Sequence, residues 1–376
     1  ARSQVRAMSG NGGVRAHVPE TRGLRERSAG ERLLEVRDLR TEFRLERSVV
    51  HAVNGVSFDV RTGETVAIVG ESGSGKSVTA QTLIGLTRSK NSRIEGSVEL
   101  EGEELLEAND AAMRRLRGEK IGMVFQDPMT SFNPVYRIGN QIVEAIRAHQ
   151  GDVDKKTARE RVVELFDSVG IPNAERRIDA YPHEFSGGMR QRAMIAMALA
   201  LEPEVLIADE PTTALDVTIQ AQILRLLEDL NRERGLATIL ITHDLGVVAE
   251  VADRVLVMYA GKVVEEGTLD EIFYDPQHPY TWGLLGSLTR IDRPRPHRLP
   301  QIAGSPPSLL DLPRGCPFRP RCPHEFSKCP EYPALEARVP ESQGHRDRCW
   351  LTPEEKRAKR QVEGQIGLEA PEAPRA

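Results

Sequence analysis

The 376-residue sequence contains no long hydrophobic run. Its longest apolar stretch, residues 193–201, is far shorter than the roughly 18 to 20 residues that a membrane-spanning helix needs. The first residues also lack the apolar segment of a signal peptide. We therefore expect no transmembrane segment, and we expect the chain to stay in the cytosol.

An excess of charge of one sign is also missing. The formal net charge is -5, from 51 Lys and Arg against 56 Asp and Glu, which gives no general attraction to nucleic acid. Arginines do gather in residues 1–32, and we interpret this arm as disordered, basic and solvated. The composition, 39% hydrophobic and 28% charged, is typical of a globular chain with one large α/β domain and a smaller appendage.

Cysteine is rare, and all four cysteines lie near the C-terminus, at Cys316, Cys322, Cys329 and Cys349. A reducing compartment disfavours two disulfides. The gaps between them do not match the short Cys-x2-4-Cys pairs of structural zinc sites, whereas four thiolates on longer loops can hold a [4Fe-4S] cluster. We expect a structural iron–sulfur cluster, with zinc or free thiols as the open alternatives.

The most informative pattern that is present is Gly-Glu-Ser-Gly-Ser-Gly-Lys-Ser at residues 70–77, which matches a phosphate-binding loop. An apolar run at 64–69 predicts a strand before it, and 77–84 predicts a helix after it. Such a loop turns its backbone N–H groups toward phosphate oxygens, while the lysine bridges the phosphates and the serine binds Mg²⁺. The expected ATP and Mg²⁺ contacts here are Gly70, Ser72, Gly73, Ser74, Gly75, Lys76, Ser77 and Val78.

A second pattern places two carboxylates at the end of an apolar strand. Residues 205–208 are apolar, and Asp209 and Glu210 follow directly. Because successive side chains of a strand alternate faces, the two carboxylates can take separate tasks. We expect Asp209 to support Mg²⁺ and Glu210 to polarise the attacking water as the general base.

A third pattern, Ser-Gly-Gly followed by Met189, opens a helical run shortly before that strand. Together, in this order, the patterns resemble those of the ATP-binding cassette (ABC) ATPases. The resemblance implies that Gln126 senses the γ-phosphate from a loop that touches a permease, and that His243 contacts the same phosphate. It also implies that Asp216 belongs to a D-loop. The signature motif, which in the family reaches ATP bound by another subunit, would consist of Ser186, Gly187, Gly188 and Met189.

The His-Pro-Tyr sequence at residues 278–280, followed by the Pro-rich linker 293–307, resembles the extension of ATPase subunits from oligopeptide and dipeptide importers. This resemblance implies ATP-driven peptide import from the cytoplasmic face of the membrane. The implied partners are two transmembrane permease subunits, a second ATPase subunit in a heterodimer and an extracytoplasmic solute-binding protein. It also favours the iron–sulfur cluster. An importer of nickel or another small solute is the alternative, because its ATPases share these motifs.

The fold that the family resemblance implies is a P-loop ABC-type nucleotide-binding domain with a parallel-sheet core, an antiparallel β subdomain and a helical subdomain. We expect this domain at 33–270, with the helical part near 103–195. A linker at 271–310 and a four-cysteine domain at 311–352 would follow, and then a disordered tail at 353–376. The residue that stacks on adenine is either Phe43 or His51. The sequence has neither the long coiled coil of a chromosome-type ATPase nor a second phosphate loop.

Overall fold

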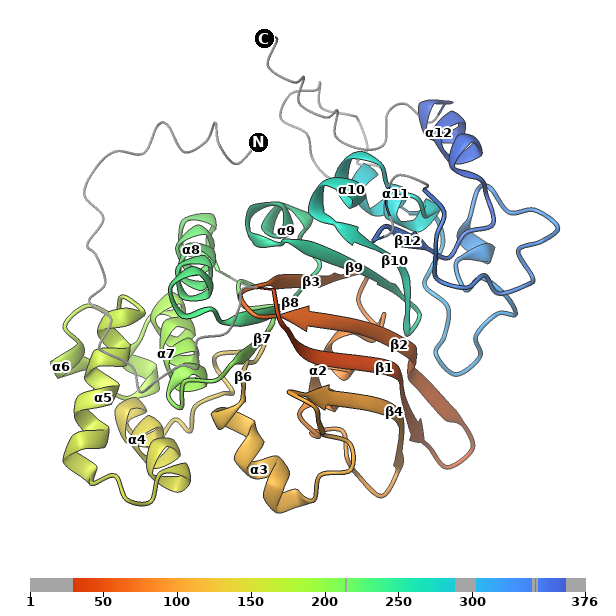
Figure 1. Cartoon of the computed structure of the whole chain (residues 1–376). Coiled ribbons are helices and arrows are strands. Elements are labelled where there is room, and N and C mark those ends of the chain that lie inside the picture. Colours follow the sequence, from red (N-terminus) through yellow and green to blue (C-terminus); the bar gives the residue numbers. More distant parts are fainter. Residues whose placement is uncertain (1–29, 214, 288–301, 340–341, 343, 363–376) are drawn as a thin grey trace, which may run out of the picture.

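The computed structural model describes residues 30–213, 215–287, 302–339, 342 and 344–362 (Figure 1). The expected basic arm up to residue 29, the linker residues 293–301 and the tail from 363 lie outside the described residues. No helix within the described ranges has both the length and the apolar character needed to cross a membrane.

A four-stranded antiparallel sheet with the order β2-β1-β4-β5 forms one layer of the fold. Strands β1 and β2 are long and pair with Leu34 opposite Val60 and Val36 opposite Phe58. These four side chains are buried and pack against the central sheet, so the apolar face of this layer closes one side of the core. The expected antiparallel subdomain is confirmed. Its strands are β1 (Arg32–Arg44), β2 (Val49–Arg61), β4 (Ser92–Leu100) and β5 (Glu103–Glu104).

The central sheet has eight strands in the order β11-β12-β10-β9-β3-β8-β7-β6. The strands from β9 to β6 are parallel, and every residue of β3, β7 and β8 is buried, as expected of apolar strands covered on both faces. The expected parallel core is therefore confirmed. Its strands are β3 (Thr65–Val69), β6 (Ile121–Val124), β7 (Val205–Asp209), β8 (Ala237–Thr242) and β9 (Arg254–Tyr259). The next strand of the sheet, β10 (Lys262–Thr268), pairs antiparallel with β9.

Helices α4 to α7 surround a second core, to which β6, β7 and α8 also contribute buried side chains. Figure 1 shows α4, α5 and α6 grouped at one end of the molecule. The segment expected to be helical, 103–195, also supplies β6, which pairs with β7 at the edge of the central sheet. The helices outside the extension are α2 (Lys76–Leu83), α3 (Asp110–Glu119), α4 (Ile138–His149), α5 (Lys155–Ser168), α6 (Ala174–Arg177), η2 (Pro182–Glu184), α7 (Gly187–Leu199), α8 (Val217–Arg234) and α9 (Leu245–Val251).

The C-terminal extension lies at the opposite end from α4, α5 and α6 (Figure 1). It joins the central sheet because β12 pairs with β10. Its elements are α10 (Leu269–Tyr274), α11 (Pro279–Gly286), η3 (Arg319–Arg321), β11 (Glu336–Ala337), β12 (Arg346–Asp347) and α12 (Pro353–Val362).

Helix α12 corrects the expectation that the chain is disordered from residue 353. The Lys356 ammonium lies 2.9 Å from a carboxylate oxygen of Asp347, and both side chains are buried. Arg360 pairs with Asp275 at the end of α10. A polar, charged composition suggested a solvated tail, but these ion pairs fix residues 353–362 against the extension.

Candidate functional site

The phosphate loop connects β3 to α2, as the sequence predicts. Gly70 has φ 151° and Gly75 has φ 100°. A Cβ atom on Gly70 would lie 2.2 Å from the Met258 carbonyl oxygen, and one on Gly75 would lie 2.4 Å from the Ala52 carbonyl oxygen. Only glycine fits such close backbone approaches, so these two residues set the path of the loop.

Lys76 is the first residue of α2 and is only 5% exposed. Its ammonium donates hydrogen bonds to the Gly70 carbonyl oxygen, over 2.8 Å, and to the Glu71 carbonyl oxygen, over 3.1 Å. Burial lowers the pKa of Lys76, and the charges of Glu210, Asp209 and Glu71 oppose that effect. The cation is thus held against the inside of the loop. The rest of the predicted loop contacts lie around it: Ser74 is buried, Ser77 and Val78 are half-buried, and Ser72 and Gly73 are exposed.

The Ser77 hydroxyl donates to Oδ1 of Asp209 over 3.0 Å. Asp209 ends β7 and is 3% exposed. Burial raises its pKa, and the nearby Glu210 carboxylate raises it further, while the Ser77 hydrogen bond and the Lys76 charge act in the opposite direction. A hydroxyl and a carboxylate oxygen side by side are hard oxygen donors of the kind that Mg²⁺ takes.

Side chains from two other chain segments converge on the Glu210 carboxylate. Gln126 donates from Nε2 to Oε2 over 2.8 Å, and Nδ1 of His243 lies 3.2 Å from Oε1. Glu210 itself has φ 48°, a strained value for a residue with a side chain, and its N–H donates to the Ile241 carbonyl oxygen. The structure therefore brings together Gln126, Glu210 and His243, which the sequence placed in separate motifs.

Thr213 is a third partner of the Glu210 carboxylate, and the sequence reasoning missed it. Its hydroxyl donates to Oε2 of Glu210 over 2.9 Å. The available signal was its position three residues after Glu210, in a turn that the Thr213 N–H closes on the Glu210 carbonyl oxygen.

The signature-motif residues Ser186 to Met189 lie at the start of a different helix, α7. The Ser186 hydroxyl caps α7 by accepting from the Met189 N–H, and Asp216 caps the neighbouring α8. A Cβ atom on Gly188 would lie 2.7 Å from Cγ2 of Ile219, so the two helix starts pack closely. In the described ranges, no hydrogen bond connects Ser186, Gly187 or Gly188 to residues 70–78.

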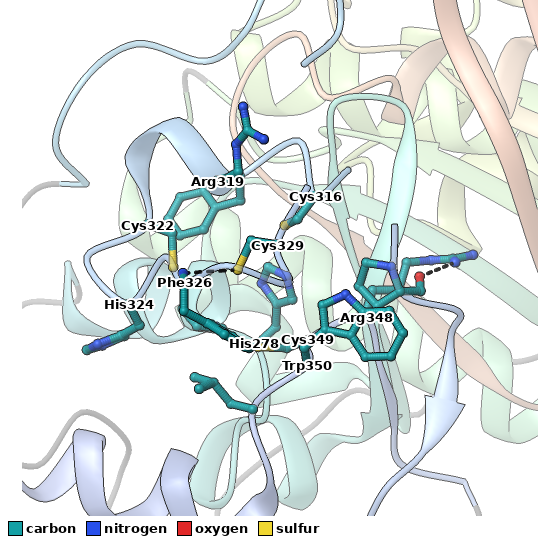
Figure 2. A pocket seen from close by; sticks show the side chains of 14 residues that line it. His278, Cys316, Arg319, Cys322, His324, Phe326, Cys329, Arg348, Cys349 and Trp350 are labelled. Carbon is teal, nitrogen blue, oxygen red and sulfur yellow. Dashed lines mark hydrogen bonds between the residues drawn. The ribbon is translucent and has the colours of Figure 1, made fainter. Parts of the chain in front are cut away.

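The four cysteines line one cavity in the extension, and Figure 2 shows them on several loops around it. All four are half-buried free thiols. Burial raises the pKa of Cys316 to about 11 and those of Cys322 and Cys349 to about 12. Their positions do not amount to a metal site as they stand, because the described ranges contain no group of three or more His, Cys, Asp or Glu arranged to hold an ion.

The two candidates for adenine stacking lie on neighbouring strands. Phe43 is half-buried near the end of β1, and Nδ1 of His51, on β2, lies 2.9 Å from a carboxylate oxygen of Glu42. The choice between Phe43 and His51 stays a prediction.

Comparison with known proteins gives two family matches and many relatives. Residues 53–213 match the ABC transporter family, and residues 264–329 match the oligopeptide/dipeptide transporter C-terminal region. The oligopeptide transport ATP-binding protein OppD of Haemophilus influenzae is 51% identical over 86% of this chain and 98% of its own length. The same protein of Salmonella typhimurium is 54% identical over 82% and 91%. The dipeptide transport ATP-binding protein DppD of Bacillus subtilis is 51% identical over 85% and 95%.

Among solved structures, the ATP-binding cassette MJ0796, in a dimeric post-hydrolysis state bound to ADP and Pi, superposes with a TM-score of 0.57. It is 28% identical and covers 63% of this chain and 99% of that chain.

Proposed function

This chain belongs to the ATP-binding subunits of ABC transporters in the oligopeptide/dipeptide family, and from that premise we propose that it hydrolyses ATP to power the import of oligopeptides or dipeptides. The observation that carries the proposal is that Gln126 and His243 both contact the carboxylate of Glu210. The preceding residue, Asp209, accepts a hydrogen bond from Ser77 of the phosphate loop. The nickel alternative is not favoured, because the close relatives are named for peptides.

We infer the following roles in hydrolysis. The loop backbone and Lys76 bind the β- and γ-phosphates, and Ser77 and Asp209 hold the Mg²⁺ shell. Glu210 accepts a proton from a water molecule while the oxygen of that water attacks the γ-phosphorus. The bond from that phosphorus to the bridging oxygen then breaks, and ADP leaves with the electron pair. Gln126 and His243, which contact Glu210, orient the water and the γ-phosphate.

The proposed active form contains two ATPase subunits. In the described ranges Ser186, Gly187 and Gly188, at the start of α7, form no hydrogen bond with the phosphate loop of their own chain, which supports a contact of these residues and Met189 with ATP held by a partner. Asp216 begins α8 beside them. We propose a heterodimer with a second ABC ATPase. Two transmembrane permease subunits would bind this pair at the cytoplasmic face of the membrane, and an extracytoplasmic solute-binding protein would deliver the peptide.

We also propose that Cys316, Cys322, Cys329 and Cys349 hold a structural [4Fe-4S] cluster, with zinc as the alternative. The donor chemistry supports this proposal, since four thiols from separate loops line one cavity that no carboxylate lines. The raised pKa values of Cys316, Cys322 and Cys349 mean that binding would have to displace protons from these three thiols. The cysteines would also have to rearrange, because the described ranges contain no group of three or more ligands positioned to hold an ion. Iron and acid-labile sulfide analysis of anaerobically purified protein tests the cluster. Finding neither would exclude it.

The proposed transport function is tested by reconstituting the chain with its permease and ATPase partners and measuring ATP hydrolysis. Peptides delivered by the binding protein should stimulate turnover. Turnover that ignores peptides and responds to nickel or another small solute would instead support the alternative.

A further inference from the structure

Glu71, the second residue of the phosphate loop, is attached to the C-terminal extension at two points. Its backbone N–H donates to the Tyr280 hydroxyl over 2.7 Å. Its carboxylate forms a two-point ion pair with Arg321, in which Nη1 lies 2.6 Å from Oε2 and Nη2 lies 3.0 Å from Oε1. Tyr280 belongs to the His-Pro-Tyr sequence, and Arg321 directly precedes Cys322. Both residues therefore come from regions that the hydrolysis mechanism leaves without a role.

Arg321 is itself held firmly. Its side chain is 5% exposed. Nε donates to the Ala303 carbonyl oxygen over 2.8 Å, Nη2 also donates to the Ile302 carbonyl oxygen, and Nη1 also reaches the Tyr259 hydroxyl. A guanidinium fixed on both edges presents a rigid pair of donors to a carboxylate. The extension thus offers Glu71 a fixed anchor rather than a mobile surface charge.

The inner side of Glu71 faces the ATP site. Its carbonyl oxygen accepts from the Lys76 ammonium over 3.1 Å and from the Ser74 N–H over 3.2 Å. Gly70 and Gly73 flank this position with φ of 151° and 77°, so the loop backbone would have many conformations if nothing restrained it. A shift of Glu71 would move the carbonyl oxygen that holds the proposed phosphate-binding lysine.

We propose that Arg321 is a positioning residue for ATP binding, which acts through Glu71 and makes the order of the phosphate loop depend on the four-cysteine segment. The inference rests on the proposed binding of ATP phosphates by this loop. A loop ordered before the ligand arrives loses less conformational entropy on binding, so the effect belongs mainly in nucleotide affinity. Tyr280 supports the same position by accepting the Glu71 N–H.

The test measures equilibrium binding of MgATP to the full chain. Arg321→Met should weaken binding on the order of tenfold, because it removes a buried, charge-assisted two-point contact. In the assembled transporter kcat should stay within about twofold while KM rises, since the groups around Glu210 are unchanged. Arg321→Lys keeps the charge but not the planar fork, and should fall between Arg321→Met and the wild type.

Two further variants separate this coupling from general damage to the extension. Glu71→Gln should weaken binding in the same direction, and the double variant should be no weaker than the more affected single variant, because both changes remove one contact. Arg346→Met is the matched control, since it breaks an ion pair that joins the extension to Glu266 of β10. We expect this control to bind MgATP like the wild type.

Wild-type affinity in both Arg321→Met and Glu71→Gln would overturn the inference. So would losses that add in the double variant, or an equal loss in Arg346→Met. Where Arg321→Met unfolds the extension, Glu71→Gln decides alone, because it leaves the extension intact. A wild-type chain that bound no MgATP would refute the proposed function itself, which distinguishes the two failures.

Discussion

Gln126 donates a hydrogen bond to one carboxylate oxygen of Glu210 over 2.8 Å. The contact follows from the sheet, since Gln126 comes soon after β6 and Glu210 directly after β7, and these strands are parallel neighbours. Their carboxyl ends meet at one edge of the sheet. The loop proposed to touch the permease is therefore in direct contact with the proposed general base, and movement of one alters the surroundings of the other.

Replacing Glu210 by Gln should stop hydrolysis without preventing ATP binding. The amide cannot accept the proton of the attacking water, so we expect turnover in the assembled transporter to fall by about 10² to 10⁴. ATP should then trap the closed dimer, which size-exclusion chromatography can detect. Glu233→Gln, an exposed change on α8, is the control. Near-normal turnover of Glu210→Gln would refute the assigned role.

Replacing Gly187 by Ala tests the contact proposed to reach a partner's ATP. The added Cβ would meet nothing closer than Cδ2 of Leu215, at 4.0 Å, so the chain should keep its melting temperature. Misplacing the partner's γ-phosphate should still lower turnover by about 10². Gly188→Ala differs, because its Cβ would lie 2.7 Å from Ile219 and should lower the melting temperature. Wild-type turnover of Gly187→Ala would argue against the partner contact.

The buried pair of His345 and Glu265 should make stability depend on pH. Nε2 of His345 lies 2.8 Å from Oε1 of Glu265, and both side chains are at most 1% exposed. Burial lowers the pKa of His345, but the hydrogen bond and charge of Glu265 outweigh it, so the pKa is raised above 6.5. Burial raises the pKa of Glu265, but its hydrogen bonds and the His345 charge outweigh it, so this pKa is lowered below 4.5.

The sign of the pH effect follows from these two shifts. The contribution of His345 to the free energy of unfolding is complete below pH 6.5 and is lost as the pH rises through its raised pKa. The contribution of Glu265 is complete above pH 4.5 and is lost as the pH falls through its lowered pKa. His345→Gln should therefore cost most between these values, by about 3 to 5 kcal/mol of unfolding free energy. Denaturant unfolding at about pH 6 and about pH 9 measures this. An equal cost at both pH values would contradict the assignment.

Lys356→Met should loosen α12 more at neutral pH than in mild acid. Burial raises the pKa of Asp347 to about 6, against the opposing charge of Lys356. Without the ammonium, the ionised carboxylate is buried at neutral pH without its Lys356 ion-pair partner, which costs about 3 to 5 kcal/mol. Below the raised pKa the carboxyl group binds a proton, so the cost should shrink. Limited proteolysis at both pH values, with the exposed Arg357→Met as control, reports the difference.

The motifs and their elements could be predicted because each is encoded in a few neighbouring residues. The strand expected at 64–69 is β3, and the helix expected at 77–84 is α2, which begins one residue earlier at Lys76. Placing Asp209 beside Ser77 needed only the rule that parallel strands end at a common edge. The family resemblance supplied Gln126 and His243, which no local pattern singles out.

The contacts of the extension could not be predicted, because they join residues far apart in sequence. Glu71 and Arg321 are separated by 250 positions, and neither residue type signals the other. Lys356 looks like a solvated lysine in a charged segment until Asp347 is placed beside it. The positions of the four cysteines in the sequence predicted that they share one site. They contain no information about how closely the thiols approach one another.

The pairing of β12 with β10 has a consequence for how the chain behaves during synthesis. Glu265 lies opposite Asp347 and Glu266 opposite Arg346, and the Arg348 N–H, just after β12, donates to the Val264 carbonyl oxygen of β10. Until residues 346–347 emerge and dock, β10 is an open sheet edge, which another chain can extend. Docking of residues 346–347 therefore covers this edge, and we expect a chain truncated before them to aggregate even where every ATP-site residue is intact.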